Sequence, residues 1–197
     1  MPNSNFQQSV LSYMLESTAG EVPGSPTMKK LRTTDPMQLS PDRGVLESEQ
    51  PYQHRQKEDQ RHGQKSVSGS IPFELSYGAF DDWIEALLGG SWSSETAGTP
   101  NTLKVGNNVN TFTVERLFKD ITQYEVFTGV FPNSMSLEIT PDYVTGSFDV
   151  IGMNHNGVSG TSLGTPSDVA TNAPFDGLGS AALMEGGSSI AVVTSLN

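Results

Sequence analysis

SVSGSIPFELS, the segment from Ser66 to Ser76, alternates polar and apolar side chains along its length. Its odd positions carry the apolar side chains Val67, Ile71, Phe73 and Leu75. A period of two is typical of a β-strand that buries one face and exposes the other. Pro72 has no backbone donor, which favours an edge strand or a bulge at that position. The segment therefore predicts a protein built around a β-sheet.

The same alternation continues downstream in two pairs of segments and one short one. Residues 134–140 lead through Pro141 and Asp142 into residues 144–150, which predicts a hairpin. Residues 111–117 and 124–130 predict a second pair around a turn at 119–120. A further short strand is predicted at 190–195. The inward-facing candidates of the second pair are Phe112, Val114, Tyr124 and Val126.

One amphipathic helix is predicted, at residues 79–88. Its apolar side chains recur at helical spacing and form one stripe: Phe80, Trp83, Ile84, Leu87 and Leu88. Asp81–Asp82 favours a helix start, because the dipole stabilises negative charge in the first turn, and Gly89–Gly90 favours a helix end. We expect three residues to anchor the helix in the core: Phe80, Trp83 and Leu87.

Charge is distributed unevenly along the 197 residues, which carry a net charge of −11. Residues 1–65 hold eight basic and eight acidic side chains, whereas residues 66–197 hold three and fourteen. No basic stripe is present that could grip nucleic acid, so specific DNA binding is not expected. The absence of cysteine excludes disulfides and thiolate metal sites. No apolar run is long enough to predict a membrane span.

The polar faces of the clearest strands contain no Lys or Arg. Ser and Thr dominate them, and the acidic exceptions are Glu74, Glu138 and Asp149. Such a small, faintly acidic face suits a channel wall that a polyanion passes without sticking. An ordinary acidic surface in contact with water remains the alternative.

We expect residues 1–30 to form an N-terminal arm and first strand, and residues 31–197 a single domain. Within that domain, residues 47–65 predict a long charged contact loop and residues 152–188 a flexible loop, because both are poor in apolar side chains. The run from His54 to His62 mixes both charge signs. It is either a solvated loop or an electrostatic clasp to a neighbouring subunit.

Two motifs suggest chemistry but lack the required surroundings. Gly160–Gly164 matches G-x-S-x-G, yet no helical pattern follows it, and every histidine precedes Ser162, the reverse of the hydrolase order. His54 and His62 are eight residues apart, a spacing that fits neither one strand face nor adjacent helical turns. We therefore expect no enzyme activity, no metal and no cofactor.

The sequence resembles the major tail tube proteins of siphophages, whose tails are long and non-contractile. The resemblance covers residues 11–197 and rests on an ordered series of matches. They include Ser48–Glu49, Arg55–Gln56, Asp59, Arg61–Gly63, Lys65–Ser70, Phe73–Asp82, Glu85–Leu87, Gly89–Trp92, Phe112–Arg116, Tyr124, Phe127–Gly129, Asn133–Leu137 and Glu185–Ser188.

This resemblance implies a mainly β fold: a tail-tube-type β-sandwich with one flanking α-helix, whose sheets join into a barrel within a hexameric ring. It implies a virion protein, assembled in the host cytoplasm, whose rings stack into a tube with a smooth acidic channel for DNA ejection. Family members continue past the strand at residue 190, so a domain that ends at Asn197 is expected to be incomplete at its C-terminus.

The implied partners are copies of the chain itself, tape-measure protein in the lumen, and tail terminator and distal tail proteins at the tube ends. Double-stranded DNA would pass through without specific binding, and no membrane is involved. Inter-subunit or inter-ring contacts are expected at Glu49, Arg55, Asp59, Arg61 and His62. Lumen-facing positions are expected at Glu74, Glu138 and Asp149.

A non-catalytic binding module on the virion, such as a carbohydrate-recognising or decorating β-sandwich, is the alternative function. That function would require clustered exposed aromatic side chains. Trp92 is the only tryptophan outside the predicted helix.

Overall fold

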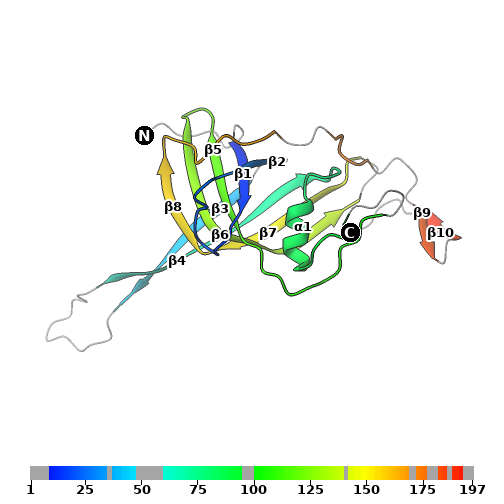
Figure 1. Ribbon diagram of the computed structural model, residues 1–197, viewed down its shortest axis with the longest axis horizontal. Coiled ribbons are helices and arrows are strands. Elements are labelled where there is room, and N and C mark those ends of the chain that lie inside the picture. The colour runs from blue at the N-terminus through cyan, green and yellow to red at the C-terminus, as the bar shows by residue number, and fades with distance from the viewer. Residues whose placement is uncertain are drawn as a thin grey trace.

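A computed structural model describes residues 9–34, 37–47, 60–94, 100–139, 142–168, 172–176, 182–185 and 188–192. Within these residues the fold is mainly β, with a single α-helix, as the sequence predicts (Figure 1). The elements are β1 (Ser9–Leu15), β2 (Lys29–Leu31), β3 (Gln38–Leu46), β4 (Arg61–Glu74), α1 (Asp81–Leu88), β5 (Phe112–Phe118), β6 (Gln123–Glu138), β7 (Thr145–Gly152), β8 (Asn154–Ser159), β9 (Ala182–Glu185) and β10 (Ser188–Val192).

The eight strands from β1 to β8 form one antiparallel sheet in the order β2-β1-β5-β6-β7-β4-β3, and β8 also pairs with β6. Both predicted hairpins are present, β5 with β6 and β6 with β7. The sequence treats residues 124–130 and 134–140 as separate strands, but β6 runs without a break from the first into the second, as far as Glu138. The layers of the sandwich are therefore two parts of one bent sheet, and the described strands of the single chain do not close it into a barrel.

The long strand β6 passes from one layer to the other near Gly129. Its register against β5 shifts between Phe112 and Val114, and Gly129 has a positive φ of 67°. A Cβ atom there would lie 2.5 Å from the Met153 side chain. Glycine is needed because the bulge that bends the strand requires a left-handed residue in a crowded place.

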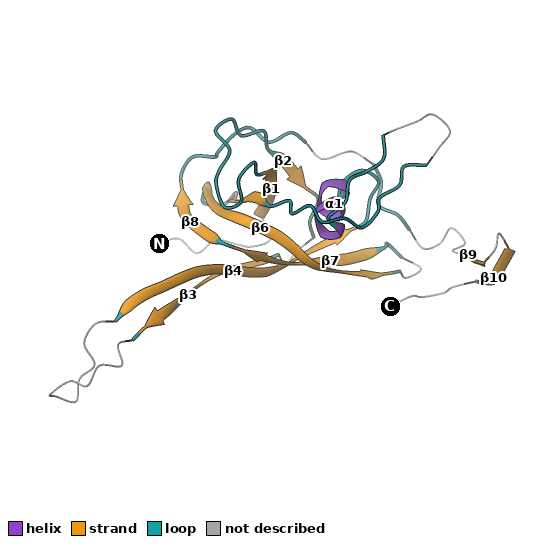
Figure 2. Cartoon of the chain, turned by 60° about the horizontal axis from the view of Figure 1, so that its bottom comes forward, coloured by secondary structure: helices purple, strands orange, loops and turns teal. Residues whose placement is uncertain are grey.

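We call β2, β1, β5, β8 and the first half of β6 the first layer, and β3, β4, β7 and the second half of β6 the second layer. The hydrophobic core lies between them and beneath α1 (Figures 1 and 2). It is rich in aromatic rings, each of which contributes about 1.5–3 kcal/mol on burial. The fully buried rings are Phe73, Phe80, Trp83, Phe112, Phe127 and Phe148.

Helix α1 begins at Asp81, two residues later than predicted, with Phe80 as its N-cap residue. Phe80 and Trp83 are buried, Ile84 and Leu87 pack partly buried against the core, and Leu88 is half-buried outside it. The helix ends where Gly89 adopts a left-handed φ of 62° and donates its N–H to the Ala86 carbonyl. Of the described residues, none lies in a helix long and apolar enough to cross a membrane.

Strands β3 and β4 extend beyond the sheet as a two-stranded ribbon (Figure 2). We define the ribbon as residues 41–47 and 60–66. The sequence predicts a loop at 47–65, but Arg61–Lys65 belong to β4. They form a strand in spite of their polarity because β3 supplies a backbone partner on either side of a register shift between Arg43 and Val45. Pro41 is tolerated because β3 is an edge strand of the described sheet.

The segment 152–188 is predicted as a flexible loop, but it contains two strands, β8 and β9, and the first residue of β10. Asn154–Ser159 form β8, which continues the β6–β7 hairpin beyond Met153. Its side chains are mostly polar, so no apolar alternation marks the strand, and backbone pairing holds it. The short strand predicted at 190–195 is observed in part, because residues 190–192 lie in β10, which pairs with β9.

Candidate functional site

The outer side of the second layer carries mostly small and acidic side chains, with the exposed Ile151 among them, and we call it the polar face. Within the described residues it contains no Lys or Arg, as the strand patterns predict. Its members are Gln38, Ser40, Asp42, Ser66, Ser68, Ser70, Pro72, Glu74, Ser134, Ser136, Glu138, Thr145, Ser147, Asp149 and Ile151.

The three side chains predicted to face a lumen lie together on this face. Glu74 and Glu138 are both in register with Thr145, from opposite sides of β7. Two rows along the sheet, Asp149 is in register with Ser70 and Ser134. Glu138 and Asp149 are exposed and Glu74 is half-buried. The structure thus brings all three onto one surface, although it leaves their role in a lumen a prediction.

Short side-chain hydrogen bonds connect the strands across the polar face. Ser134 Oγ donates to Asp149 Oδ2 at 2.9 Å. The hydroxyl oxygens of Ser136 and Ser147 are also 2.9 Å apart. These cross-strand pairs hold the hydroxyls close to the sheet and keep the surface shallow.

The opposite side of the same strands is rigidly packed. Phe73 stacks on Phe148 with 4.7 Å between ring centroids. Gly146 lies beside Phe73, where an added Cβ would come within 2.8 Å of the ring. The polar face is therefore supported by a dense aromatic layer that limits its movement.

The predicted contact residues lie at the other end of β4. Arg61 and His62 begin that strand and are exposed on the ribbon. Glu49, Arg55 and Asp59 lie outside the described residues. The ribbon itself follows from the pairing of β3 with β4, which the sequence analysis did not predict.

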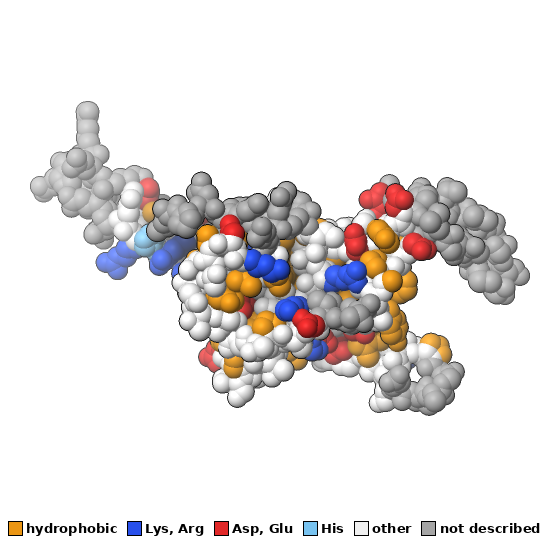
Figure 3. All heavy atoms as spheres, turned by 90° about the horizontal axis from the view of Figure 1, so that it is seen from above, with side chains coloured by type: hydrophobic (Ala, Val, Ile, Leu, Met, Phe, Trp, Pro, Cys, Tyr) orange, Lys and Arg blue, Asp and Glu red, His pale blue; other side chains and the backbone are white. Residues whose placement is uncertain are grey.

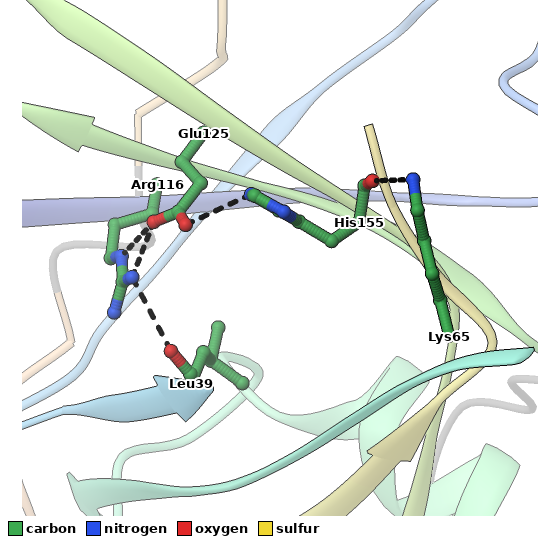
Figure 4. Close-up of polar contacts among 5 residues, drawn as sticks. All are labelled: Leu39, Lys65, Arg116, Glu125 and His155. Carbon is green, nitrogen blue, oxygen red and sulfur yellow. Dashed lines mark hydrogen bonds and ion pairs between the residues drawn. The ribbon is translucent and has the colours of Figure 1, made fainter. Parts of the chain in front are cut away.

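A buried ionic cluster holds the base of the ribbon against the first layer (Figure 4). The Arg116 guanidinium forms an ion pair with Glu125 and donates to the Leu39 carbonyl oxygen of β3 at 3.3 Å. On the other side of Glu125, its Oε1 lies 2.9 Å from His155 Nε2. Lys65 Nζ of β4 donates to the His155 carbonyl oxygen at 3.0 Å. Both ribbon strands are thereby tied to the first layer.

Sequence analysis missed this cluster. The only signal was a charged pair, Glu115–Arg116, within an apolar strand pattern, and the pattern alone does not show which partners meet it. Glu125 comes from the neighbouring strand β6 and His155 from the unpredicted strand β8. Glu125 is the cross-strand partner of Arg116 in the predicted hairpin of β5 and β6, whereas His155 reaches the pair only through the pairing of β6 with β8.

Ser162, the serine of the G-x-S-x-G match, has a structural role. Its hydroxyl donates to Glu115 Oε1 at 2.7 Å and lies 2.7 Å from the Gly164 carbonyl oxygen. The Leu163 N–H donates to the other oxygen of Glu115, also at 2.7 Å. Glu115 is buried, and these bonds satisfy its carboxylate while fastening the loop to β5.

A second buried carboxylate, Glu16, fastens the loop after β1. It accepts hydrogen bonds from the hydroxyls of Thr111 and Thr113 and from the N–H groups of Gly20 and Gly129. Across the described part of the chain, no group of three or more His, Asp or Glu side chains is placed to hold a metal ion. Glu16 and Glu115 fasten loops to the strands through the hydrogen bonds given above.

A family model described as phage tail tube protein matches residues 7–197. No curated protein matches the chain significantly. Three similar solved structures are the sheath/tube terminator and the sheath–tube complex of an extracellular contractile injection system (PVC) in the extended state, and the baseplate of the anti-feeding prophage.

The sheath/tube terminator is 12% identical, with a TM-score of 0.48 over 81% of this chain and 98% of that chain. The sheath–tube complex is 11% identical, with a TM-score of 0.45 over 80% and 91%. The baseplate is 7% identical, with a TM-score of 0.43 over 81% and 95%. The family match spans all the strands described above.

Proposed function

Because this chain belongs to the phage tail tube protein family, we propose that it polymerises as stacked hexameric rings into the tail tube of a siphophage. As a tail tube protein it is a structural, non-catalytic component of the virion. In this proposal the polar face lines the lumen, and the subunits assemble in the host cytoplasm before the tail is complete.

The polar face is the observation that carries the proposal. It offers exposed carboxylates at Glu138 and Asp149 and no cation that could bind phosphate. A surface of this kind repels DNA weakly and evenly, so DNA can slide during ejection without being held. The same small side chains leave room in the lumen for tape-measure protein before DNA enters.

The open edges of the second layer suggest how a ring could close. Among the described residues, β3 pairs only with β4, and residues 131–138 of β6 pair only with β7. Unpaired strand edges are avoided in stable proteins, and pairing with a neighbour removes them. Repetition around a closed ring would join six second layers into one inner barrel.

The ribbon supplies a contact that reaches beyond the subunit body. It projects from the body in Figure 2, and the cluster of Arg116, Glu125 and His155 holds its base. We assign inter-subunit or inter-ring contacts to Arg61 and His62 on the ribbon, and to Glu49, Arg55 and Asp59 in the residues that join its strands. Tail terminator and distal tail proteins would cover the tube ends.

Negative-stain electron microscopy of the purified chain tests the proposal, because a tube protein has to form hollow particles, whereas the function of a binding module does not require them. We expect rings or tubes of uniform width at high protein concentration, or after addition of the phage components that initiate a tail. A chain that stays monomeric under both conditions would contradict the proposal. Sixfold symmetry in averaged end views would decide the ring number.

A further inference from the structure

The two ends of the second layer expose different kinds of side chain. In Figure 3, basic side chains and a histidine lie along the ribbon, whereas acidic side chains gather at the opposite end. Strand β4 runs the whole distance, because Arg61 starts it on the ribbon and Glu74 ends it. Its fourteen residues separate the two ends by about 40 Å at the usual rise of a strand.

The ribbon combines apolar and cationic groups. Val45 and Leu46 are 57% and 62% exposed, an unusual state for two adjacent aliphatic side chains. Arg43, Arg61 and His62 are exposed beside them. The acidic members of the ribbon are Asp42 and Glu47, and Glu47 accepts a hydrogen bond from Gln60 Nε2 at 3.3 Å.

The opposite end is built from three backbone segments that lie side by side, residues 75–77, 142–144 and 172–176. The Phe175 N–H donates to the Leu75 carbonyl, and the Val144 N–H donates to the Phe175 carbonyl. We call these segments the rim. Arg32 approaches it from the body and donates to the Asn172 carbonyl.

The rim exposes rings and carboxylates together. Tyr77, Tyr143 and Phe175 are 71%, 52% and 47% exposed. The acidic side chains of the rim are Asp142 and Asp176, both exposed. Tyrosine and phenylalanine faces attract arginine, and paired aromatic and arginine side chains carry much of the energy of protein interfaces.

We propose that the rim is the docking surface for the ribbon of a second copy of this chain. The inference rests on the proposed function and deepens it by naming the surface that receives the ribbon. Aliphatic Val45 and Leu46 would pack on the rim rings, and Arg43 and Arg61 would meet the rim carboxylates. The partner is another copy because the ribbon is too far from its own rim.

This contact has the symmetry that a tube requires. Ribbon and rim are different surfaces at opposite ends of one layer, so the interface is heterologous and each copy can bind one neighbour at each end. Such an interface repeats without limit along an axis. The polar face between the two ends stays uncovered in this arrangement.

Cysteine cross-linking tests the contact directly, because the natural chain contains no cysteine. Val45→Cys and Tyr77→Cys are prepared separately, mixed, polymerised and treated with a short bismaleimide. We expect covalent dimers in the mixture and a ladder of longer species from the double variant. Val45→Cys mixed with Val105→Cys is the matched control, because Val105 is 80% exposed but lies outside the rim.

Charge exchange provides an independent measurement. Reversal at the ribbon, Arg43→Glu with Arg61→Glu, and reversal at the rim, Asp142→Arg with Asp176→Arg, should each raise the critical concentration for polymerisation roughly tenfold. The two reversals combined should restore it. If tubes form normally but the double cysteine variant gives no cross-linked ladder, or the combined charge reversals do not restore polymerisation, the rim assignment alone is overturned. Wild-type protein that forms no tubes would overturn the proposed function and the docking inference with it.

Discussion

The indole ring of Trp83 stacks on the phenyl ring of Phe112, with 4.9 Å between the ring centroids and 15° between the planes. Phe112 belongs to the first layer. The ring centroid of Trp83 also lies 5.6 Å from that of Phe148, which belongs to the second layer. One side chain from the single helix therefore joins both layers, so helix docking and closure of the core depend on the same contact.

Replacement of Trp83 by alanine should destabilise the subunit severely. The side chain is fully buried, and loss of a buried tryptophan typically costs about 3–5 kcal/mol in the free energy of unfolding. Urea denaturation followed by circular dichroism measures the loss. Trp92→Ala is the matched control, because Trp92 is 36% exposed and donates one hydrogen bond to the Asp81 carbonyl. Equal losses in the two variants would contradict this account of the core.

Removal of one partner of the buried ion pair between Arg116 and Glu125 should destabilise the protein strongly, whereas replacement of both by apolar side chains should destabilise it little. Glu125→Gln leaves a buried guanidinium without its counter-ion, which typically costs about 3–5 kcal/mol. The double variant Arg116→Met with Glu125→Leu removes both charges and should recover most of the free energy of unfolding. Urea midpoints of the single and double variants provide the comparison. If the double variant is less stable to urea than the single variant, the hydrogen bond from Arg116 to the Leu39 carbonyl contributes more to stability than the ion pair does.

Strands with one buried face could be predicted from the sequence, as could the helix. Apolar side chains recur at every second residue around Phe73 and Phe148 and at helical spacing around Trp83. Both patterns indicate an element that buries one face, which is the arrangement that hydrophobic periodicity can detect. The composition of the polar face was predictable for the same reason. Glu74, Glu138 and Asp149 alternate with buried or half-buried side chains, so these three residues share a side once the strands pair in the observed register.

The elements that the sequence did not reveal are those whose order comes from partners distant in the chain. In β5, Thr113 and Glu115 are as buried as Val114, because loops cover the outer side of the strand. Strand β8 has hardly any apolar signal and is ordered by pairing with β6. The ribbon is polar along most of its length. Periodicity in a single strand contains no information about such pairings.

The free energy of unfolding should fall at alkaline pH because of Tyr13. Burial, reinforced by Asp82, holds the pKa of the Tyr13 phenol well above its ordinary value, and the hydroxyl donates to Asp82 Oδ2 at 3.0 Å. The unfolded state therefore loses the proton first, so the stabilisation is complete below pH 10 and declines above it. We expect a loss of about 1.4 kcal/mol between pH 9 and pH 11. Tyr13→Phe should remove this part of the pH dependence, and an unchanged slope in that variant would contradict the assignment.

Cations placed on the polar face should slow the passage of DNA and leave the tube intact. Glu138→Lys with Asp149→Lys changes two exposed side chains on a surface whose opposite side is packed by Phe73 and Phe148, so folding should be little affected. Each lysine can pair with phosphate, and the pairing would repeat around and along a lumen lined by this face.

We expect normal tubes in electron micrographs and slower DNA release from particles that carry the variant, with the difference shrinking as salt rises. The matched control is Glu21→Lys with Asp120→Lys, which makes the same charge change on exposed residues outside the polar face. If both double variants release DNA at the wild-type rate, the polar face is not the lumen wall. If both slow release equally, the effect comes from net charge and not from the position of the cations.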